Sequence, residues 1–250
     1  LMILPVAAQA NTATFVQEHS RWRNDDGGES TATWKADADT AITGVVRGQN
    51  IRLRFEIANT SASYTGTMAA RPEYATRSNG TWTAVSPISD GTLPFEMTPT
   101  SGYANQAGTT AQLAGSGTFV TGRAVANPAN TGDNVSYGVS QRSEFEYCFR
   151  ATAKASGNTT YYFRVSNAGG ALTYNQYAQL TMASGDASEP PLVTSPLAVS
   201  AVVMAPFSYQ VRASGSEPIS YGASNILPVG LTLSGNTLSG TPPAPDGSAA

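Results

Sequence analysis

The sequence predicts an all-β protein of two β-sandwich domains, and composition, strand periodicity and a lack of helical periodicity support this prediction. The 250 residues include 24 Gly and 15 Pro. Ser and Thr are also abundant, so turn formers and β-favouring residues dominate a chain poor in helix formers. Only 12% of the residues are charged and 40% are hydrophobic, which excludes the highly charged kind of disorder. No stretch reaches the roughly 20 apolar residues of a membrane-spanning helix.

Strict alternation marks the longest strands of this prediction. Apolar residues occupy every second position of 51–57 and 145–149, with charged residues between many of them. This pattern is typical of a half-buried strand whose charged face meets solvent. We expect 144–150 to pair with 159–165 as an antiparallel partner. We also expect a tight hairpin within 73–85, where an Asn-Gly dipeptide can supply positive φ values.

Composition shifts divide the chain into four parts. Residues 1–10 are apolar and end in Ala-Gln-Ala, as does the tail of a secretory signal peptide before its cleavage site. Residues 11–183 contain strand patterns throughout and predict one β-sandwich domain. Residues 184–192 are small and polar and include two prolines, which predicts an interdomain linker. Residues 193–250 contain a second series of short strands.

The second series carries a family resemblance. Four segments in this order are Pro206–Val211, Tyr221–Ala223, Leu227–Leu233 and Leu238–Pro242. Together they resemble the immunoglobulin-like repeat family, related to cadherin-like modules, that recurs in large bacterial exported proteins. The resemblance implies an immunoglobulin-like sandwich. Residues 11–183 resemble, more loosely, the β-rich domains of bacterial surface proteins.

The chain departs from that family at three points. Met204 stands where the family usually has glycine, and the hairpin around Gly235 is shorter than the common form. Members of the family continue past their Gly-Thr-Pro motif into two more strands, whereas this sequence stops at Ala250. We therefore expect the second sandwich to be incomplete, with an open apolar groove.

Few residues are available for catalysis or metal binding. The chain has one His, His19, and one Cys, Cys148. This excludes a zinc site of ordinary composition and a disulfide within the chain. Glu144 and Glu146 share a strand face at a spacing that glycosidases use, but we expect them on the solvated side of the sandwich. No catalytic residue and no cofactor are therefore predicted.

Calcium is the one ion that the sequence leaves open. Asp25, Asp26, Asp37 and Asp39 supply hard oxygen ligands in two short segments. Neither segment fits the twelve-residue helix-loop-helix calcium pattern. Asp and Asn beside Gly are also the usual residues of an ordinary turn, so both interpretations stand.

Three tryptophans are candidates for stacking against sugar rings: Trp22, Trp34 and Trp82. Most Trp residues of a sandwich pack in the core or along its edges. Trp82 lies in the predicted hairpin with Tyr74, and we expect it to be the most exposed of the three.

These observations favour a non-enzymatic structural or adhesive segment of a large bacterial secreted or cell-surface protein, located outside the cell. Its expected partners are other domains of the same polypeptide, with cell-surface or polysaccharide ligands as an option. The net charge of −3 argues against nucleic acid and anionic membrane surfaces, which favour clustered Lys and Arg. One alternative is a glycan-binding accessory module of a secreted hydrolase. Another is a filament subunit completed by a strand from its neighbour, suggested by the apolar first residues and the missing last strands.

Overall fold

The structure is a computed structural model that describes residues 12–184, 192–196, 198–214, 219–223 and 227–244. The described residues form twenty strands and no helix, which confirms the predicted all-β class. The chain separates into two compact units, unit 1 (Leu1–Ser184) and unit 2 (Gly185–Ala250). The predicted signal remnant at 1–10 and most of the predicted linker at 184–192 lie outside the described residues.

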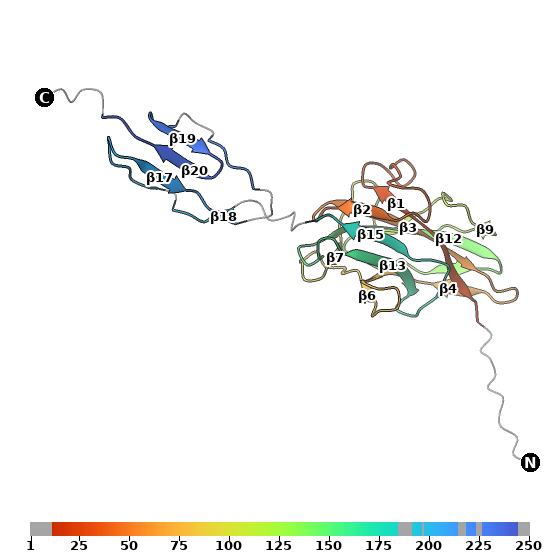
Figure 1. The fold of residues 1–250 in the computed structure, drawn as a ribbon. Helices are drawn as coiled ribbons and strands as arrows, with labels where there is room; N and C mark the ends of the chain where they lie inside the picture. Colours follow the sequence, from red (N-terminus) through yellow and green to blue (C-terminus); the bar gives the residue numbers. More distant parts are fainter. Residues whose placement is uncertain (1–11, 185–191, 197, 215–218, 224–226, 245–250) are drawn as a thin grey trace, which may run out of the picture. The chain divides into compact units, whose positions relative to one another are not determined.

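The larger sheet of unit 1 has eight strands (Figure 1). Their bounds are β1 (Phe15–Asn24), β3 (Asn50–Asn59), β7 (Phe95–Met97), β8 (Ala107–Gly108), β9 (Thr118–Phe119), β10 (Arg123–Val125), β12 (Gln141–Ala151) and β14 (Thr173–Tyr174). The order is β14-β1-β3-β12-β10-β8, and β7 and β9 also pair with β12. β3 runs antiparallel to both β1 and β12, so Leu53 lies opposite Trp22 on one side and Tyr147 on the other.

The second sheet of unit 1 has five strands in the order β2-β15-β13-β5-β6. Their bounds are β2 (Ile42–Val45), β5 (Ala70–Ala75), β6 (Thr83–Ala84), β13 (Thr160–Asn167) and β15 (Ala178–Met182). A separate antiparallel pair is formed by β4 (Gly66–Met68) and β11 (Val135–Tyr137).

The two sheets pack face to face around an aromatic core. The Phe149 ring of β12 stacks on the Phe163 ring of β13 with centroids 5.3 Å apart. Trp22 of β1 meets the same Phe163 ring edge-on at 5.5 Å. Phe95 contacts both phenylalanine rings. Burial of such rings, with their edge-to-face contacts, supplies much of the free energy that holds a sandwich together.

One expected strand pairing and one expected turn differ from the structure. β12 and β13 do not pair with each other: β12 pairs with β3, and β13 pairs with β5 and β15. The chain crosses between the sheets after β12. Phe149 of β12 and Phe163 of β13 therefore meet across the core. The hairpin of β5 and β6 does form, but its loop spans residues 76–82 and Gly80 has no positive φ.

Unit 2 contains a three-stranded sheet and a separate strand pair. The sheet has the order β17-β20-β19, and the pair joins β16 and β18. The bounds are β16 (Leu192–Val193), β17 (Phe207–Gln210), β18 (Ala213–Ser214), β19 (Leu231–Ser234) and β20 (Thr237–Gly240). Gly235 and Asn236 form the expected two-residue turn, since Ser234 lies opposite Thr237. Residues 198–203 and 219–223 of the predicted second series have no strand structure.

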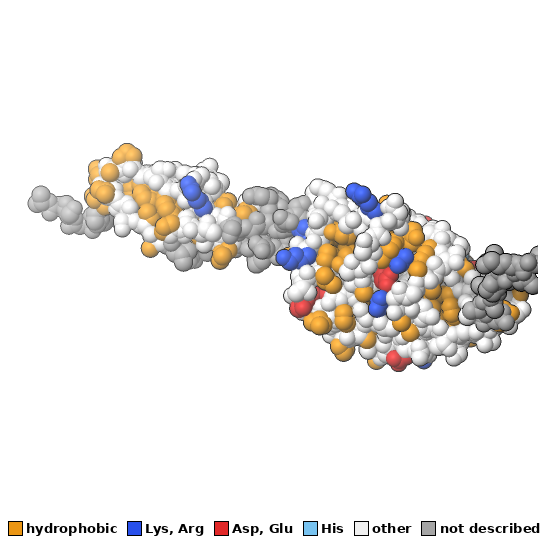
Figure 2. All heavy atoms as spheres, turned by 90° about the horizontal axis from the view of Figure 1, so that it is seen from below, with side chains coloured by type: hydrophobic (Ala, Val, Ile, Leu, Met, Phe, Trp, Pro, Cys, Tyr) orange, Lys and Arg blue, Asp and Glu red, His pale blue; other side chains and the backbone are white. Residues whose placement is uncertain are grey.

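The apolar side chains of unit 2 are incompletely covered. None of its residues with a described side chain is buried, and the alternate positions of β17 and β19 are only half-buried. Figure 2 shows hydrophobic side chains gathered on the visible face of this unit. Met204 has a φ of 60°, in the left-handed region that favours glycine. This backbone geometry explains why glycine suits the position better than a larger residue.

Candidate functional site: a buried layer of ion pairs

The face of the eight-stranded sheet that points away from the core carries charged side chains, and most of them are buried. We call these side chains, together with two carboxyl groups that pair with them from the segment after β1, the charged layer. Its members are Arg23, Asp25, Arg52, Arg54, Glu29, Glu56, Arg142, Glu144 and Glu146. The side chains of Arg23, Arg52, Arg54, Glu56, Glu144 and Glu146 are each at most 1% exposed. The expectation that this face meets solvent is therefore wrong.

Two segments with little regular structure cover the charged layer. Residues 25–39 lie over it from one side, where Arg23 donates to the carbonyl of Ala32 at 2.9 Å. Residues 98–122 lie over it from the other, where Arg54 donates to the carbonyl of Thr110 at 3.0 Å. The two polar segments thus shield the charged layer from solvent. Guanidinium groups can hold them in place because each carries several hydrogen-bond donors in one plane.

Glu146 of β12 lies at the centre of the charged layer. Its Oε2 accepts hydrogen bonds from Arg54 Nε at 2.8 Å and Arg23 Nη1 at 3.1 Å. Arg52 Nη1 lies 3.6 Å from its Oε1. One carboxylate is therefore shared by three guanidinium groups. Removing it would leave several cations buried with too little compensating charge.

Glu144, two residues earlier on β12, fixes the second loop. Its Oε2 accepts from Arg54 Nη1 at 2.8 Å. Its Oε1 accepts from the backbone N–H groups of Gln112 and Leu113, each at 2.8 Å. Both candidate carboxylates are thus committed to protein donors and closed to solvent, which leaves no room for a sugar between them. The arrangement does not supply the accessible acid and base of glycoside hydrolysis.

Asp25 and Glu29 belong to the first loop, residues 25–39, and tie it to arginine side chains of β3. Asp25 accepts hydrogen bonds from Arg52 and from the Thr100 hydroxyl. Burial alone would raise the pKa of this carboxyl, but these hydrogen bonds outweigh burial and lower the pKa. Glu29 pairs with Arg54 and accepts from the backbone N–H of Thr110, so its pKa is lowered for the same reason.

The four calcium candidates are not brought together. Asp25 is held by Arg52, and Asp26 accepts from the backbone N–H and the hydroxyl of Thr33. Asp39 accepts from the backbone N–H of Ser20 and lies 2.6 Å from a ring nitrogen of His19. The Asp37 side chain is 95% exposed. Among the residues that the structure describes, no three His, Cys, Asp or Glu side chains could share a metal ion.

The three tryptophans occupy different environments. Trp22 is 1% exposed in the core, so it is not available to stack on a ligand at the surface. Trp34 lies on the covering loop, and the guanidinium groups of Arg21 and Arg23 sit 4.5 and 4.3 Å from its ring centre. It extends the charged layer by cation–π contact.

Trp82 belongs to a half-buried aromatic cluster made of Trp82, Tyr174, Tyr177 and Arg164. The Arg164 guanidinium lies 4.3 Å from the centre of the Trp82 ring and 5.1 Å from that of Tyr174. The rings of Trp82 and Tyr177 lie 5.0 Å apart at an angle of 37°. Arg164 is fixed by two hydrogen bonds to Glu73, of 3.0 and 2.9 Å. The cluster is tilted rather than coplanar, and part of the Trp82 ring is already covered.

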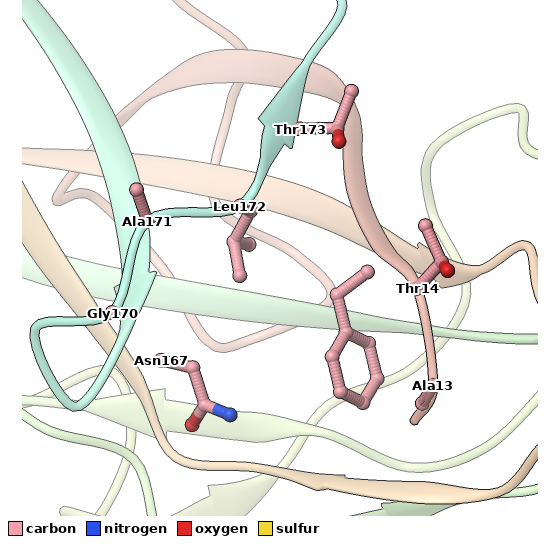
Figure 3. Close-up of a pocket in the computed structure, with 8 residues that line it drawn as sticks. Ala13, Thr14, Asn167, Gly170, Ala171, Leu172 and Thr173 are labelled. Carbon is pink, nitrogen blue, oxygen red and sulfur yellow. The ribbon is translucent and has the colours of Figure 1, made fainter. Parts of the chain in front are cut away.

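Two cavities of unit 1 lie outside the charged layer. One of about 440 Å³ opens beside the start of β1, and Figure 3 shows Leu172 and Asn167 pointing into it. Its eight lining residues include no titratable side chain. Another of about 300 Å³ is lined by Glu18, Asn59 and Ser140 among others. The lining of this second cavity includes one carboxyl group, that of Glu18, and no His or Cys.

The remaining reactive side chain, Cys148, faces the charged layer and is fully buried. Its Sγ lies 3.4 Å from the hydroxyl of Thr98. Burial raises the pKa of the thiol to about 12, so the sulfur stays protonated and unreactive.

Sequence reasoning missed several members of the charged layer, chiefly Arg52, Arg54, Glu56 and Arg142. A signal was present, because positions 52, 54 and 56 on one strand and 142, 144 and 146 on another are all charged in a chain with so few charges. Across the paired strands Arg54 lies opposite Glu146, which is a favourable cross-strand pair.

No protein-family model matches the chain, and no curated protein matches it. Within the described ranges, no helix is long and apolar enough to cross a membrane. Fold and site define an all-β protein with a β-sandwich in which a layer of charged side chains is buried on the outer face of one sheet.

Proposed function

We propose that the chain is a non-enzymatic structural or adhesive segment of a large bacterial secreted or cell-surface protein. In this role the β-sandwich acts as a spacer or display module, and its partners are neighbouring domains of the same polypeptide. The observation that carries the proposal is the charged layer. The carboxylates best suited to acid and base chemistry are instead bound to guanidinium groups that fasten loops to a sheet.

A spacer must resist being pulled apart, and the charged layer supports that role. Arg54 by itself joins three segments of the chain. It binds Glu144 and Glu146 of β12. It also donates to the carbonyl groups of Glu29 and Thr110 in the two covering loops. Such ties connect segments that lie far apart in the sequence. Their loss under load requires buried charges to separate, which is costly at low dielectric.

Force spectroscopy on the full chain, held by handles at both ends, tests the proposal. We expect unit 1 to unfold in one step at a well-defined force, and Glu146→Gln to lower that force. The exposed Asp37→Asn variant is the matched control and should leave the force unchanged. Extension of unit 1 without a distinct unfolding step, as for an unstructured chain, would contradict the spacer role.

The aromatic cluster favours a second candidate, a glycan-binding accessory module of a secreted hydrolase. Flat rings beside a fixed guanidinium match the apolar faces and hydroxyl groups of a sugar. A glycan array with the full chain, repeated with Trp82→Ala, tests this function. Signal that Trp82→Ala removes and Tyr64→Ala retains would support it, because Tyr64 is an exposed aromatic residue outside the cluster. An empty array would exclude it for the glycans presented.

Unit 2 favours a third candidate, a filament subunit completed by a strand from a neighbouring copy. A groove of about 210 Å³ in this unit is lined by Val193, Val211, Ile219 and Leu233 among others. An added strand could cover such apolar side chains. Sedimentation over a hundredfold concentration range tests this candidate. A folded monomer throughout that range would exclude it.

A further inference from the structure

The charged layer contains an odd number of ionisable groups. Its guanidinium groups are Arg23, Arg52, Arg54 and Arg142, and its carboxyl groups are Asp25, Glu29, Glu56, Glu144 and Glu146. Within this set four guanidinium groups face five carboxyls, so full ionisation leaves one carboxylate without a guanidinium group of its own. A single proton on one carboxyl would balance it, and buried charge without compensation is strongly unfavourable.

The hydrogen bonds identify which of the five carboxyl groups holds the balancing proton. Asp25, Glu29, Glu144 and Glu146 each accept at least two hydrogen bonds. Both carboxyl oxygens of Glu56 are buried and have no hydrogen-bond partner. Glu56 is therefore the carboxyl for which ionisation is least supported.

The charged and titratable neighbours of Glu56 reinforce this assignment. Glu144 lies directly opposite it on β12, and two like charges in that position repel each other. Arg142 Nη1 is 3.5 Å from Glu56 Oε2, but it is shared with Glu144 Oε1 at the same distance. On β1, His19 lies opposite Glu56, and Glu18 adds a negative charge nearby.

A loop rests directly on this carboxyl. A Cβ built on Gly115 would fall 1.3 Å from Glu56 Oε1, so the glycine backbone packs against the carboxyl group. The next two residues, Ser116 and Gly117, line the cavity of about 300 Å³ that also contains Glu18 and Asn59. We call residues 109–117 the latch loop. No charged side chain of the latch loop faces Glu56, since 109–117 contains none.

We propose that the latch loop is a pH-dependent closure, held on the sheet when Glu56 carries a proton and loosened when Glu56 ionises. Ionisation places the fifth negative charge beneath Gly115, and the charge gains hydration only if the loop lifts. Lifting the loop opens the Glu56 carboxyl group toward the adjacent polar cavity. The device is independent of the spacer role and would operate in any function that exposes unit 1 to changes of pH.

The direction and size of the effect follow from linkage. Burial, together with the charge of Glu144 and against the attraction of Arg142, raises the pKa of Glu56 from 4.5 to about 7. Closure is therefore strongest below pH 4.5 and weakens as the pH rises to 7. If the open loop restores the ordinary pKa, the opening equilibrium constant grows about tenfold per pH unit, and on the order of 300-fold in all.

Hydrogen exchange on the full chain tests the closure. The reporters are the amides of Gln112 and Leu113, which donate to Glu144. After correction for intrinsic exchange, their protection should fall by on the order of a hundredfold between pH 5 and pH 8 in the unmodified protein. In Glu56→Gln the protection should stay constant over this range, because glutamine does not titrate.

A matched control separates Glu56 from the nearby histidine. His19 is itself titratable: hydrogen bonding to Asp39 raises its pKa against the opposing effect of burial. His19→Gln should retain the pH dependence of the latch loop. An equal fall of protection in Glu56→Gln would overturn the proposal. So would a Glu56 carboxyl ¹³C resonance in the unmodified protein that titrates near 4.5.

Discussion

Glu146→Gln perturbs the charged layer where one carboxylate meets three guanidinium groups. It preserves the size of the side chain and removes one negative charge. The carboxylate it replaces is fully buried, accepts hydrogen bonds of 2.8 and 3.1 Å from Arg54 and Arg23, and lies 3.6 Å from Arg52. Breaking one side of a buried ion pair typically costs about 3 to 5 kcal/mol. We expect the free energy of unfolding of unit 1 to fall by about this amount.

Urea unfolding followed by tryptophan fluorescence measures this loss. All three tryptophans lie in unit 1, at positions 22, 34 and 82, so the signal reports this unit alone. The slope of the unfolding free energy against urea concentration should be unchanged, because both proteins expose the same surface on unfolding. Asp37→Asn, at the exposed end of the ion pair with Arg21, is the control and should leave the midpoint unchanged. A loss below about 1 kcal/mol for Glu146→Gln would refute the view that buried ion pairs hold the layer together.

Two further predictions follow from packing and burial. Gly115→Ala should destabilise unit 1 by about 1 to 3 kcal/mol in urea unfolding, because its methyl group collides with the buried carboxyl of Glu56; an unchanged midpoint would contradict the tight contact. Cys148 should resist alkylation in the native protein and react fully in urea, because its thiol is buried and its pKa is raised to about 12. Mass spectrometry of the alkylated protein checks this, and rapid labelling without urea would show that the sheet opens readily.

The strands of unit 1 could be predicted because their periodicity is unusually clear. Ile51, Leu53, Phe55 and Ile57 face the core as the alternation indicates, and each is at most 1% exposed. Fold class depends on such local patterns, which persist in the folded sheet. The partner of each strand was harder to predict, since β12 and β13 are neighbours in sequence yet belong to different sheets.

The charged layer was not predicted because alternation reports which face is polar, not whether that face is covered. The lid is made by polar loops at 25–39 and 98–122, and nothing in their composition distinguishes a covering loop from an exposed one. Their burial comes from side chains such as Arg54, which reach carbonyl groups of both loops. Hydrogen bonds between residues so far apart in the chain produce no repeating pattern in the sequence.

Chemical modification of arginine measures the burial of the charged layer most directly. The native full chain is treated with phenylglyoxal, and each arginine is followed by mass spectrometry. The account predicts that Arg52 and Arg54, which have no exposed surface, react far more slowly than the exposed Arg77 and Arg212. In urea all four should react alike. Modification of Arg52 and Arg54 in the native protein as fast as Arg77 would mean that this face of the sheet is open to solvent, and the structural account of the charged layer would be wrong.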